Sequence, residues 1–401
     1  MFSARIKTHH SAMASGKKYV MGPRNVQNYL SSTEESDKDN STIYIHVPFC
    51  NKICSFCNMR RSLQKPSDNY YKLIIQEIEN YAKLSYVKNS VFDAVYFGGG
   101  TPTTLTSDEL KYILQALFKN LNFTKDVEVT IETTVTELTD EKVEILGENG
   151  VTRFSVGIQT FNDSGRKQMN RIGSGEYVYR KLQQLKNSKK FTVSMDLIYN
   201  YSGQSIRDLE EDLNKICELD LDGFSMYSLI NMKETEINEA QNLANDEEMF
   251  FFIAEKMKKA GYEFLELTKM VKNDKYKYIM NRHQGADTLA LGAGAGGSMN
   301  DLMMMNEISI DKYAESIENF SARQGMLFVP EYKDITIFKG DIQTLKLPAN
   351  ESLYSDEIRY TEFVQKLLDE EYIYHHNEGY RLTTKGVFWG NSISRALYDM
   401  I

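Results

Sequence analysis

From residue 42 to residue 229, short strand-like runs alternate with stretches of helical periodicity. The strand-like runs are rich in β-branched and aromatic residues and lie at 42–47, 92–97, 127–132, 153–158, 192–198 and 223–229. The helix-like stretches lie between them at 69–87, 107–120, 139–149, 176–186 and 205–219. Strands separated by helices pair in parallel, with right-handed crossovers. The expected fold class is therefore α/β, a partial TIM-like barrel of six strand–helix units.

The rest of the chain predicts additional parts around this barrel. Residues 1–40 are expected to form an N-terminal arm, because residues 1–33 carry five lysines and arginines and no acid. Residues 41–235 are the expected core barrel. Residues 236–330 are its expected extension, where a long helix-like run at 234–260 leads to a Gly-rich segment at 292–297. Residues 331–401 return to short mixed periodicity and predict a small C-terminal α+β domain.

Composition places the chain among ordinary globular proteins, with 41% hydrophobic and 26% charged residues and 6 prolines in 401. No apolar run approaches the roughly 18 residues that a membrane span needs, and the N-terminal region lacks the apolar core of a secretory signal. A formal net charge of -9 argues against general nucleic-acid binding, which needs a basic face. We expect a cytoplasmic protein with neither a membrane nor a nucleic-acid partner.

Unusual polar residues follow the predicted strands one after another. The first strand leads into a cysteine-rich loop, the second into Gly98-Gly-Gly-Thr-Pro-Thr103, and the third ends at Glu132. Gln159 follows the fourth strand, Asp196 lies near the end of the fifth, and the sixth runs into residues 228–230. Parallel α/β barrels bind their ligands at the carboxyl ends of the strands. These residues therefore predict a single site at one end of the barrel.

Three of the 4 cysteines, Cys50, Cys54 and Cys57, fall within eight residues, whereas Cys217 lies in a helix-like stretch and is expected to be a core thiol. Thiols this closely spaced indicate a metal or cluster site, not a disulfide framework. A structural zinc site and an electron-transfer [4Fe–4S] cluster both use four ligands. Three thiolates on a cubane leave one iron open to chelate the amino and carboxylate groups of S-adenosylmethionine. The alternative is a zinc site completed by a distant residue.

The segment Ile43-Tyr-Ile-His-Val-Pro-Phe-Cys50, followed by Cys54, Cys57 and the glycine motif at 98–103, resembles the radical S-adenosylmethionine superfamily. The resemblance extends over about residues 41–300. It implies that the three cysteines ligate a [4Fe–4S] cluster. It also implies contacts to the adenine of S-adenosylmethionine from Tyr44, Phe56 and Ile230, and contacts to the rest of that molecule from Gly99, Gly100, Thr101, Glu132, Gln159, Arg171 and Asp196.

The implied polar contacts agree with the chemistry of the side chains. Gly99 and Gly100 let the backbone approach the methionine moiety closely. Glu132 offers a carboxylate to the ammonium group or to ribose hydroxyls, and Asp196 offers one to the ribose. Arg171 offers a cation to the carboxylate of the cofactor.

Within the superfamily, the chain is similar to the branch of oxygen-independent coproporphyrinogen III dehydrogenases, haem chaperones and haem-degrading anaerobilin synthases. The dehydrogenases have a Gly-Cys pair after the third cysteine, where this chain has Asn58-Met59. The chaperones have a histidine in the Gly-rich segment, which here is Gly292-Ala-Gly-Ala-Gly-Gly297. That segment and Leu382-Thr-Thr-Lys-Gly-Val-Phe-Trp-Gly390 resemble the anaerobilin synthases. The chain departs from the branch at Asn200-Tyr-Ser-Gly-Gln204, where members usually have Leu-Pro before Gly-Gln.

The resemblance implies a radical C-methyltransferase that opens haem anaerobically and releases iron and a linear tetrapyrrole. A reduced cluster would cleave S-adenosylmethionine to a 5′-deoxyadenosyl radical, which would abstract hydrogen from the methyl group of a second S-adenosylmethionine. The new carbon radical would add to a meso carbon of the porphyrin, and a flavodoxin-type donor would supply the electron. The alternatives are a haem chaperone that passes intact haem on and, third, an oxygen-independent coproporphyrinogen III dehydrogenase.

A haem site needs apolar or methionine walls and cations for two propionates. The methionines at 299, 303, 304 and 305 are candidates for a wall or an axial thioether, with packing as the simpler role. Arg60 and Arg61 are candidates for the propionates, or solvated surface residues. His9 and His10 are iron-ligand candidates or part of a mobile tail. The basic arm is a candidate lid over bound haem, or a tail without a role.

Overall fold

The computed structural model describes residues 1–8, 19–33, 40–64, 66, 69–230, 243–348, 357–377 and 379–401. Its centre is a 13-stranded sheet whose strands lie in the order β1-β13-β12-β11-β10-β2-β3-β4-β5-β6-β7-β9-β8. The middle of this sheet is parallel and consists of β10 (Thr288–Leu291), β2 (Ser41–Val47), β3 (Val91–Gly99), β4 (Asn122–Thr133), β5 (Arg153–Gln159), β6 (Thr192–Tyr199) and β7 (Gly223–Ser228). The prediction of an α/β fold with a largely parallel sheet is confirmed.

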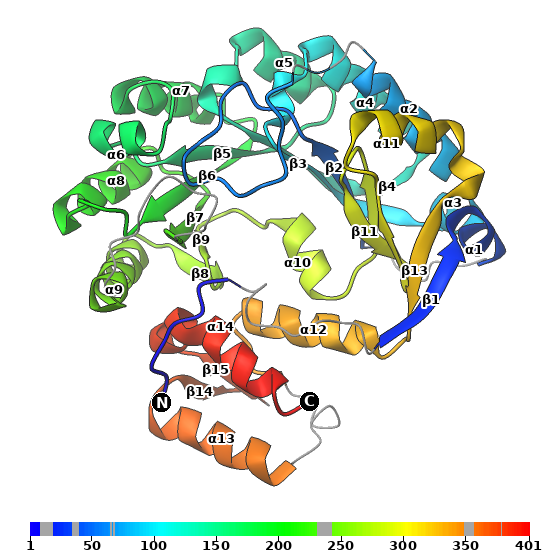
Figure 1. Cartoon of the computed structure of the whole chain (residues 1–401). Helices are drawn as coiled ribbons and strands as arrows, with labels where there is room; N and C mark the ends of the chain where they lie inside the picture. The colour runs from blue at the N-terminus through cyan, green and yellow to red at the C-terminus, as the bar shows by residue number, and fades with distance from the viewer. Residues whose placement is uncertain are drawn as a thin grey trace.

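Helices follow the parallel strands and cover the outer side of the curved sheet (Figure 1). They are α2 (Tyr70–Tyr81), α4 (Ser107–Asn120), α5 (Asp140–Glu148), α7 (Gly175–Asn187) and α8 (Ile206–Glu218). The helix expected at 69–87 is two helices, α2 and the short α3 (Ser85–Asn89), and α6 (Asp163–Gln168) was not expected. Thr106 and Ser205 form capping boxes at the N-termini of α4 and α8. A capping box fixes the first turn of a helix, and the predicted starts of these two helices agree with the structure.

Antiparallel strands extend the sheet at both edges. On one side lie β11 (Gly296–Met299), β12 (Leu302–Met305), β13 (Gln324–Phe328) and β1 (Val20–Asn25), and on the other β9 (Lys269–Val271) and β8 (Glu263–Glu266). The Gly-rich segment is therefore a tight turn followed by a strand. Part of the expected N-terminal arm, residues 20–25, belongs to the same sheet, and α1 (Val26–Ser32) follows it.

The remaining elements do not belong to the repeating strand–helix units or to the large sheet. They are α9 (Leu243–Lys259), α10 (Lys277–His283), α11 (Ile310–Glu318), α12 (Tyr332–Gln343), α13 (Glu357–Asp369), β14 (Ile373–His376), β15 (Gly379–Leu382) and α14 (Thr384–Tyr398). In Figure 1, α12 to α14 lie below the open side of the sheet, and the N-terminus lies beside them. The start of the helix-like run expected at 234–260 falls outside the described residues, and its later part is α9.

The two faces of the sheet differ in polarity because side chains alternate along each strand. The outward face is apolar and fully buried against the helices, as at Phe97, Ile131 and Met195, each 0% exposed. The inward face is polar and carries Glu132 and Tyr227. Tyr227 keeps 44% of its surface accessible although it lies within a central strand. Part of the inward face packs into a small buried cluster of Ala94, Tyr96 and Tyr278, and Tyr227 borders the remaining space inside the sheet, which we call the lumen.

Candidate functional site

The three clustered cysteines lie on the loop between β2 and α2, at the carboxyl end of the first predicted strand. The amide of Cys50 donates to the carbonyl of Ser62 at 2.9 Å, and the amide of Ser62 donates to the carbonyl of Pro48 at 2.6 Å. The amide of Thr101 donates to the carbonyl of Phe49 at 2.8 Å. These bonds close the base of the loop and fasten it to the glycine motif after β3.

Basic side chains surround the thiols. Arg171 Nη1 lies 3.2 Å from Cys54 Sγ, and a cleft lined by Lys52 and Arg171 opens beside that cysteine. Burial raises the pKa of the Cys50 and Cys57 thiols, and the charge of Arg61 opposes that shift at both. Cations favour the thiolate form, which is the form that ligates metals.

The thiols are not gathered as the ligands of one ion would be. Within the part of the chain that the structure describes, no three His, Cys, Asp or Glu side chains are grouped so as to hold a single metal ion. The charges of Cys54 and Cys57 nevertheless act on Cys50, which places the three thiols in one neighbourhood. A cubane distributes its thiolate ligands over different iron atoms, so a wider spacing suits it better than a mononuclear zinc site.

The glycine motif is shaped to leave room beside this loop. Gly99 has a φ of +113°, and a Cβ placed there would lie 2.6 Å from the His46 ring. A Cβ on Gly100 would lie 2.5 Å from the carbonyl oxygen of Phe49 and 3.0 Å from Cys50 Sγ. A side chain at position 99 would displace the His46 ring and strain a left-handed φ, and one at position 100 would push the cluster loop outward, so glycine is favoured at both.

Two carboxylates lie in the lumen above the polar inward face. The hydroxyl of Tyr96 donates to Glu132 at 2.6 Å, and the amide of Gly99 donates to it at 3.3 Å. Burial raises the pKa of Glu132 to about 7, and the nearby Asp196 adds to that shift. Burial also raises the pKa of Asp196, against the opposing charge of Lys269. A cationic or hydroxyl-rich ligand in the lumen would stabilise the ionised form of both carboxylates.

Several buried polar atoms near the thiols have no partner in the described structure, and they test whether S-adenosylmethionine fits. Gln159 ends β5 with a φ of 68°, and its Oε1 is buried without a hydrogen bond. Arg171 donates through Nη2 to the carbonyl of Gly157, whereas its Nε is buried without a partner. Buried polar groups are rarely left unsatisfied. An amino-acid ligand beside Cys54 would satisfy both, so the residues fit the group.

The expected adenine contacts lie on two sides of this space. Tyr44 projects from β2, donates or accepts a hydrogen bond with His46 Nδ1 at 2.9 Å, and stacks on Tyr278 at 6.2 Å. Phe56 packs instead on a small apolar cluster that includes Leu229. Ile230 follows Leu229 and is the last residue described before position 243. The sequence-predicted cofactor residues therefore lie on the parallel strands and on the loops that follow them, and their roles stay predictions.

Sequence reasoning missed a buried ion-pair network at the floor of the lumen. Arg153 pairs with Asp274 at 2.7 Å, and Lys269 pairs with Asp274 at 3.1 Å and donates to Ser194 at 2.6 Å. Although burial alone would raise it, the two cations hold the pKa of Asp274 well below its usual value. Alternation along the fourth strand could have placed Arg153 on the inner face, but nothing local identified its partners.

The candidate haem contacts are scattered. Met299 and Met304 are 0% and 3% exposed and belong to the core, whereas Met305 is 59% exposed. Arg60 Nη1 lies 3.5 Å from Met305 Sδ, and Arg61 Nη1 donates to the carbonyl of Met59 at 2.8 Å. His9 and His10 lie outside the described residues.

Arg5 and Lys7, two cations of the N-terminal arm, already have partners elsewhere in the folded chain. Arg5 pairs with Asp246 at 2.9 Å, donates to the hydroxyl of Tyr199 at 3.1 Å and lies over the Phe388 ring. Lys7 Nζ donates to the carbonyl of Leu229 at 3.1 Å. These contacts join the first residues of the chain to α9, α14 and the end of β7. Arg5 is therefore committed to a buried acid and is not available to a propionate.

Cys217 is separate from the site. It is half-buried on α8 and lies 3.9 Å from Met257 Sδ, as expected for a core thiol. No described helix has the length and apolar character needed to cross a membrane.

The fold and the cysteine loop agree with a radical SAM enzyme, and residues 44–216 match the Radical SAM superfamily. More particularly, the chain is similar to anaerobilin synthase, to heme chaperones and to oxygen-independent coproporphyrinogen III oxidase. It is 27% identical over 379 residues to anaerobilin synthase of Escherichia coli, and the alignment covers 90% of this chain and 84% of that protein. It is 26% identical over 372 residues to heme chaperone HemW of Lactococcus lactis, and that alignment covers 89% of this chain and 96% of the chaperone.

The fold agrees with this grouping. The solved structure of coproporphyrinogen III oxidase (HemN) from Escherichia coli superposes with a TM-score of 0.78 at 19% identity and covers 96% of both chains. The predictions of the superfamily and of its branch are confirmed.

Proposed function

We propose that this protein opens the haem ring anaerobically by radical transfer of a one-carbon unit from S-adenosylmethionine, with release of iron and a linear tetrapyrrole. The proposal extends to two molecules of S-adenosylmethionine, to a flavodoxin-type electron donor and to the cytoplasm as the place of action. When bound, the cluster and S-adenosylmethionine supply the radical chemistry. The protein's own residues bind, orient and exclude water.

The observation that favours ring opening over a chaperone role is the glycine at position 296. Haem chaperones have a histidine at this place in the Gly-rich segment, and a side chain at position 296 would point at Met305, 3.2 Å from its Cε. This chain thus lacks the histidine that the resemblance implies for a chaperone at this position. Asn58-Met59 separates it from the coproporphyrinogen enzymes in the same way. The similarity to anaerobilin synthase over most of both chains supports the same choice.

The residues around the lumen divide the proposed work. Cys50, Cys54 and Cys57 would hold the cluster, and Arg171 would pair with the carboxylate of the cofactor beside Cys54. Glu132 would accept from the cofactor once it has lost its proton. The aromatic face of Tyr44 would pack on the adenine and help to exclude water from the reacting centre.

Absorption spectroscopy under anaerobic conditions tests the proposal. The reconstituted enzyme is mixed with haem, S-adenosylmethionine and a reductant, and the Soret band is followed over time. We expect the band to bleach only when all three components are present. A chaperone would instead leave the band intact and transfer haem to an acceptor apoprotein. A coproporphyrinogen enzyme would leave haem unchanged and release carbon dioxide from coproporphyrinogen III.

A further inference from the structure

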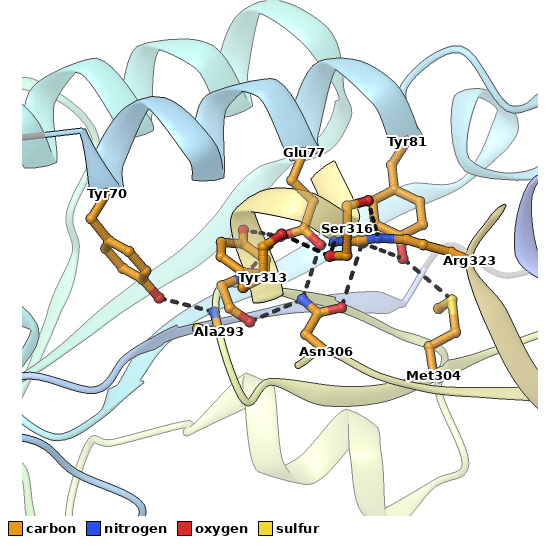
Figure 2. Close-up of polar contacts among 10 residues, drawn as sticks. Tyr70, Glu77, Tyr81, Ala293, Met304, Asn306, Tyr313, Ser316 and Arg323 are labelled. Atoms are coloured by element: carbon orange, nitrogen blue, oxygen red, sulfur yellow. Dashed lines mark hydrogen bonds and ion pairs between the residues drawn. The ribbon is translucent and has the colours of Figure 1, made fainter. Parts of the chain in front are cut away.

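A buried carboxylate on α2 fastens the Gly-rich turn to the barrel (Figure 2). Glu77 is 0% exposed and accepts from the amide of Gly292 at 2.8 Å, from Asn306 Nδ2 at 2.9 Å and from the hydroxyl of Tyr313 at 2.5 Å. It also forms an ion pair with Arg323. A buried carboxylate satisfied on both oxygens holds its partners rigidly, because losing any of them would leave a charge unpaired.

The same turn is held from its other side. The hydroxyl of Tyr70 donates to the carbonyl of His46 at 2.8 Å and accepts from the amide of Ala293 at 2.9 Å. The amide of Gly294 donates to the carbonyl of Glu307 at 2.9 Å, and the amide of Asn306 donates to the carbonyl of Ala295 at 2.8 Å. Residues 292–295 and 304–307 therefore form one rigid support beside His46, four residues before the first cluster cysteine.

Apolar side chains point away from this support into solvent. Asn306 turns inward and is 8% exposed, whereas Met305 is 59% and Ile308 60% exposed. Arg60 of the cluster loop contacts the same support, with its Nη1 3.5 Å from both Met305 Sδ and the carbonyl of Gly294. A Cβ on Gly294 would lie 4.0 Å from Ile308. We call Arg60, Met305 and Ile308 the methionine rim.

The chemistry of the methionine rim fits a flat apolar molecule with a carboxylate at its edge. An exposed apolar patch bordered by a polar or charged side chain is a common feature of a binding site. Arg60 has only neutral partners among the described residues, Met305 Sδ and a carbonyl, so its charge is free to meet an anion. The bare backbone at Gly296 leaves the approach to Met305 open. Arg61, by contrast, acts on the thiols of Cys50 and Cys57.

We infer that the methionine rim is the docking face for haem, with Met305 and Ile308 against the porphyrin plane and Arg60 on one propionate. This inference rests on the proposed function and names where its substrate binds. Methionine adapts to flat aromatic ligands because its side chain is flexible and polarizable. The rim borders the cluster loop, so haem bound there lies next to the place where the radical would form.

Titration of haem into the anaerobic, cluster-loaded protein tests the inference, with haem dimethyl ester as a second probe that lacks the propionate charges. Met305→Ser combined with Ile308→Ser should weaken binding of both probes about tenfold, through lost apolar contact. Arg60→Glu should weaken haem binding about tenfold and leave binding of the dimethyl ester within about twofold of wild type.

Matched controls separate the rim from general surface effects. Ile358→Ser removes an apolar side chain that is 74% exposed on α13, and Lys190→Glu reverses an exposed charge after α7. Neither should change the affinity for either probe. The iron content of each reconstituted rim variant shows whether the neighbouring loop still holds its cluster.

The possible outcomes are distinct. Wild-type affinity for haem in both rim variants would refute the docking face while leaving the proposed function standing. A wild-type protein that binds neither probe would refute the proposed function and the docking face together. If rim variants bind haem normally but accept electrons slowly from flavodoxin and normally from dithionite, the face belongs to the electron donor and the inference is wrong.

Discussion

Glu132→Gln should stabilise the cofactor-free fold at alkaline pH while weakening S-adenosylmethionine binding. Burial raises the pKa of Glu132 from 4.5 to about 7, so the folded protein keeps a proton that the unfolded chain has already released in that window. Because the unfolded state then binds fewer protons, stability falls as pH rises from about 4.5 to about 7. The full loss is roughly 3 kcal/mol, at about 1.4 kcal/mol for each pH unit. A glutamine side chain does not titrate, so the variant does not lose this stability as the pH rises.

The assay is urea-induced unfolding of cluster-loaded wild type and variant without S-adenosylmethionine, at about pH 5.5 and about pH 8.5. Near pH 5.5 only about one pH unit of this window has been crossed, so the variant should be more stable by roughly 1.4 kcal/mol, and this smaller difference serves as the internal control. Near pH 8.5 the variant should be more stable by roughly 3 kcal/mol. A variant that is equally or less stable at the higher pH would show that Glu132 is not buried as a near-neutral acid, and the reasoning would fail.

Three further perturbations follow from the site and its support. Cys54→Ala should abolish cluster assembly, measured as iron per chain, whereas Cys217→Ala should leave it nearly unchanged; equal iron loss in both would refute the three-cysteine site. Gly100→Ala should also impair cluster assembly, because its Cβ would lie 2.5 Å from a backbone oxygen of the cluster loop. Normal iron content in this variant would show that the loop can shift without losing its cluster. Glu77→Ala should lower the unfolding free energy by about 3–5 kcal/mol, because it leaves a buried arginine without its acid. The exposed Glu79→Ala on the same helix should lower it by less than about 0.5 kcal/mol. Similar losses in both variants would show that Glu77 does not hold the Gly-rich turn.

The parallel core was predictable because its strands are long, apolar on the outer face and separated by helices of clear periodicity. All six expected strands are present in the described structure within a few residues of their expected bounds. The strands at the edges were not predictable in this way. β11 and β12 are four residues each and rich in glycine or methionine, so their strand character comes from pairing with one another and with β10 and β13.

The candidate site was partly predictable for a related physical reason. Residues at strand ends, such as Glu132 and Asp196, converge because parallel strands end at one edge of the sheet. The lumen floor was hidden, because Arg153 meets Asp274 from a segment 121 positions away. The basic arm misled in part, since its charge suggested an anionic ligand and Arg5 instead meets Asp246. Charge composition shows which sign a segment carries but not which partner the fold supplies.

Mass spectrometry of the tetrapyrrole formed from haem and S-adenosylmethionine labelled with carbon-13 in its methyl group is the most direct test of ring opening by one-carbon transfer. The reconstituted enzyme is incubated anaerobically with both compounds and a reductant, and the products are separated before analysis. The account predicts an iron-free, open-chain tetrapyrrole that carries the labelled carbon. Recovery of intact haem, with the label confined to S-adenosylmethionine and methionine although 5′-deoxyadenosine has formed, would contradict it.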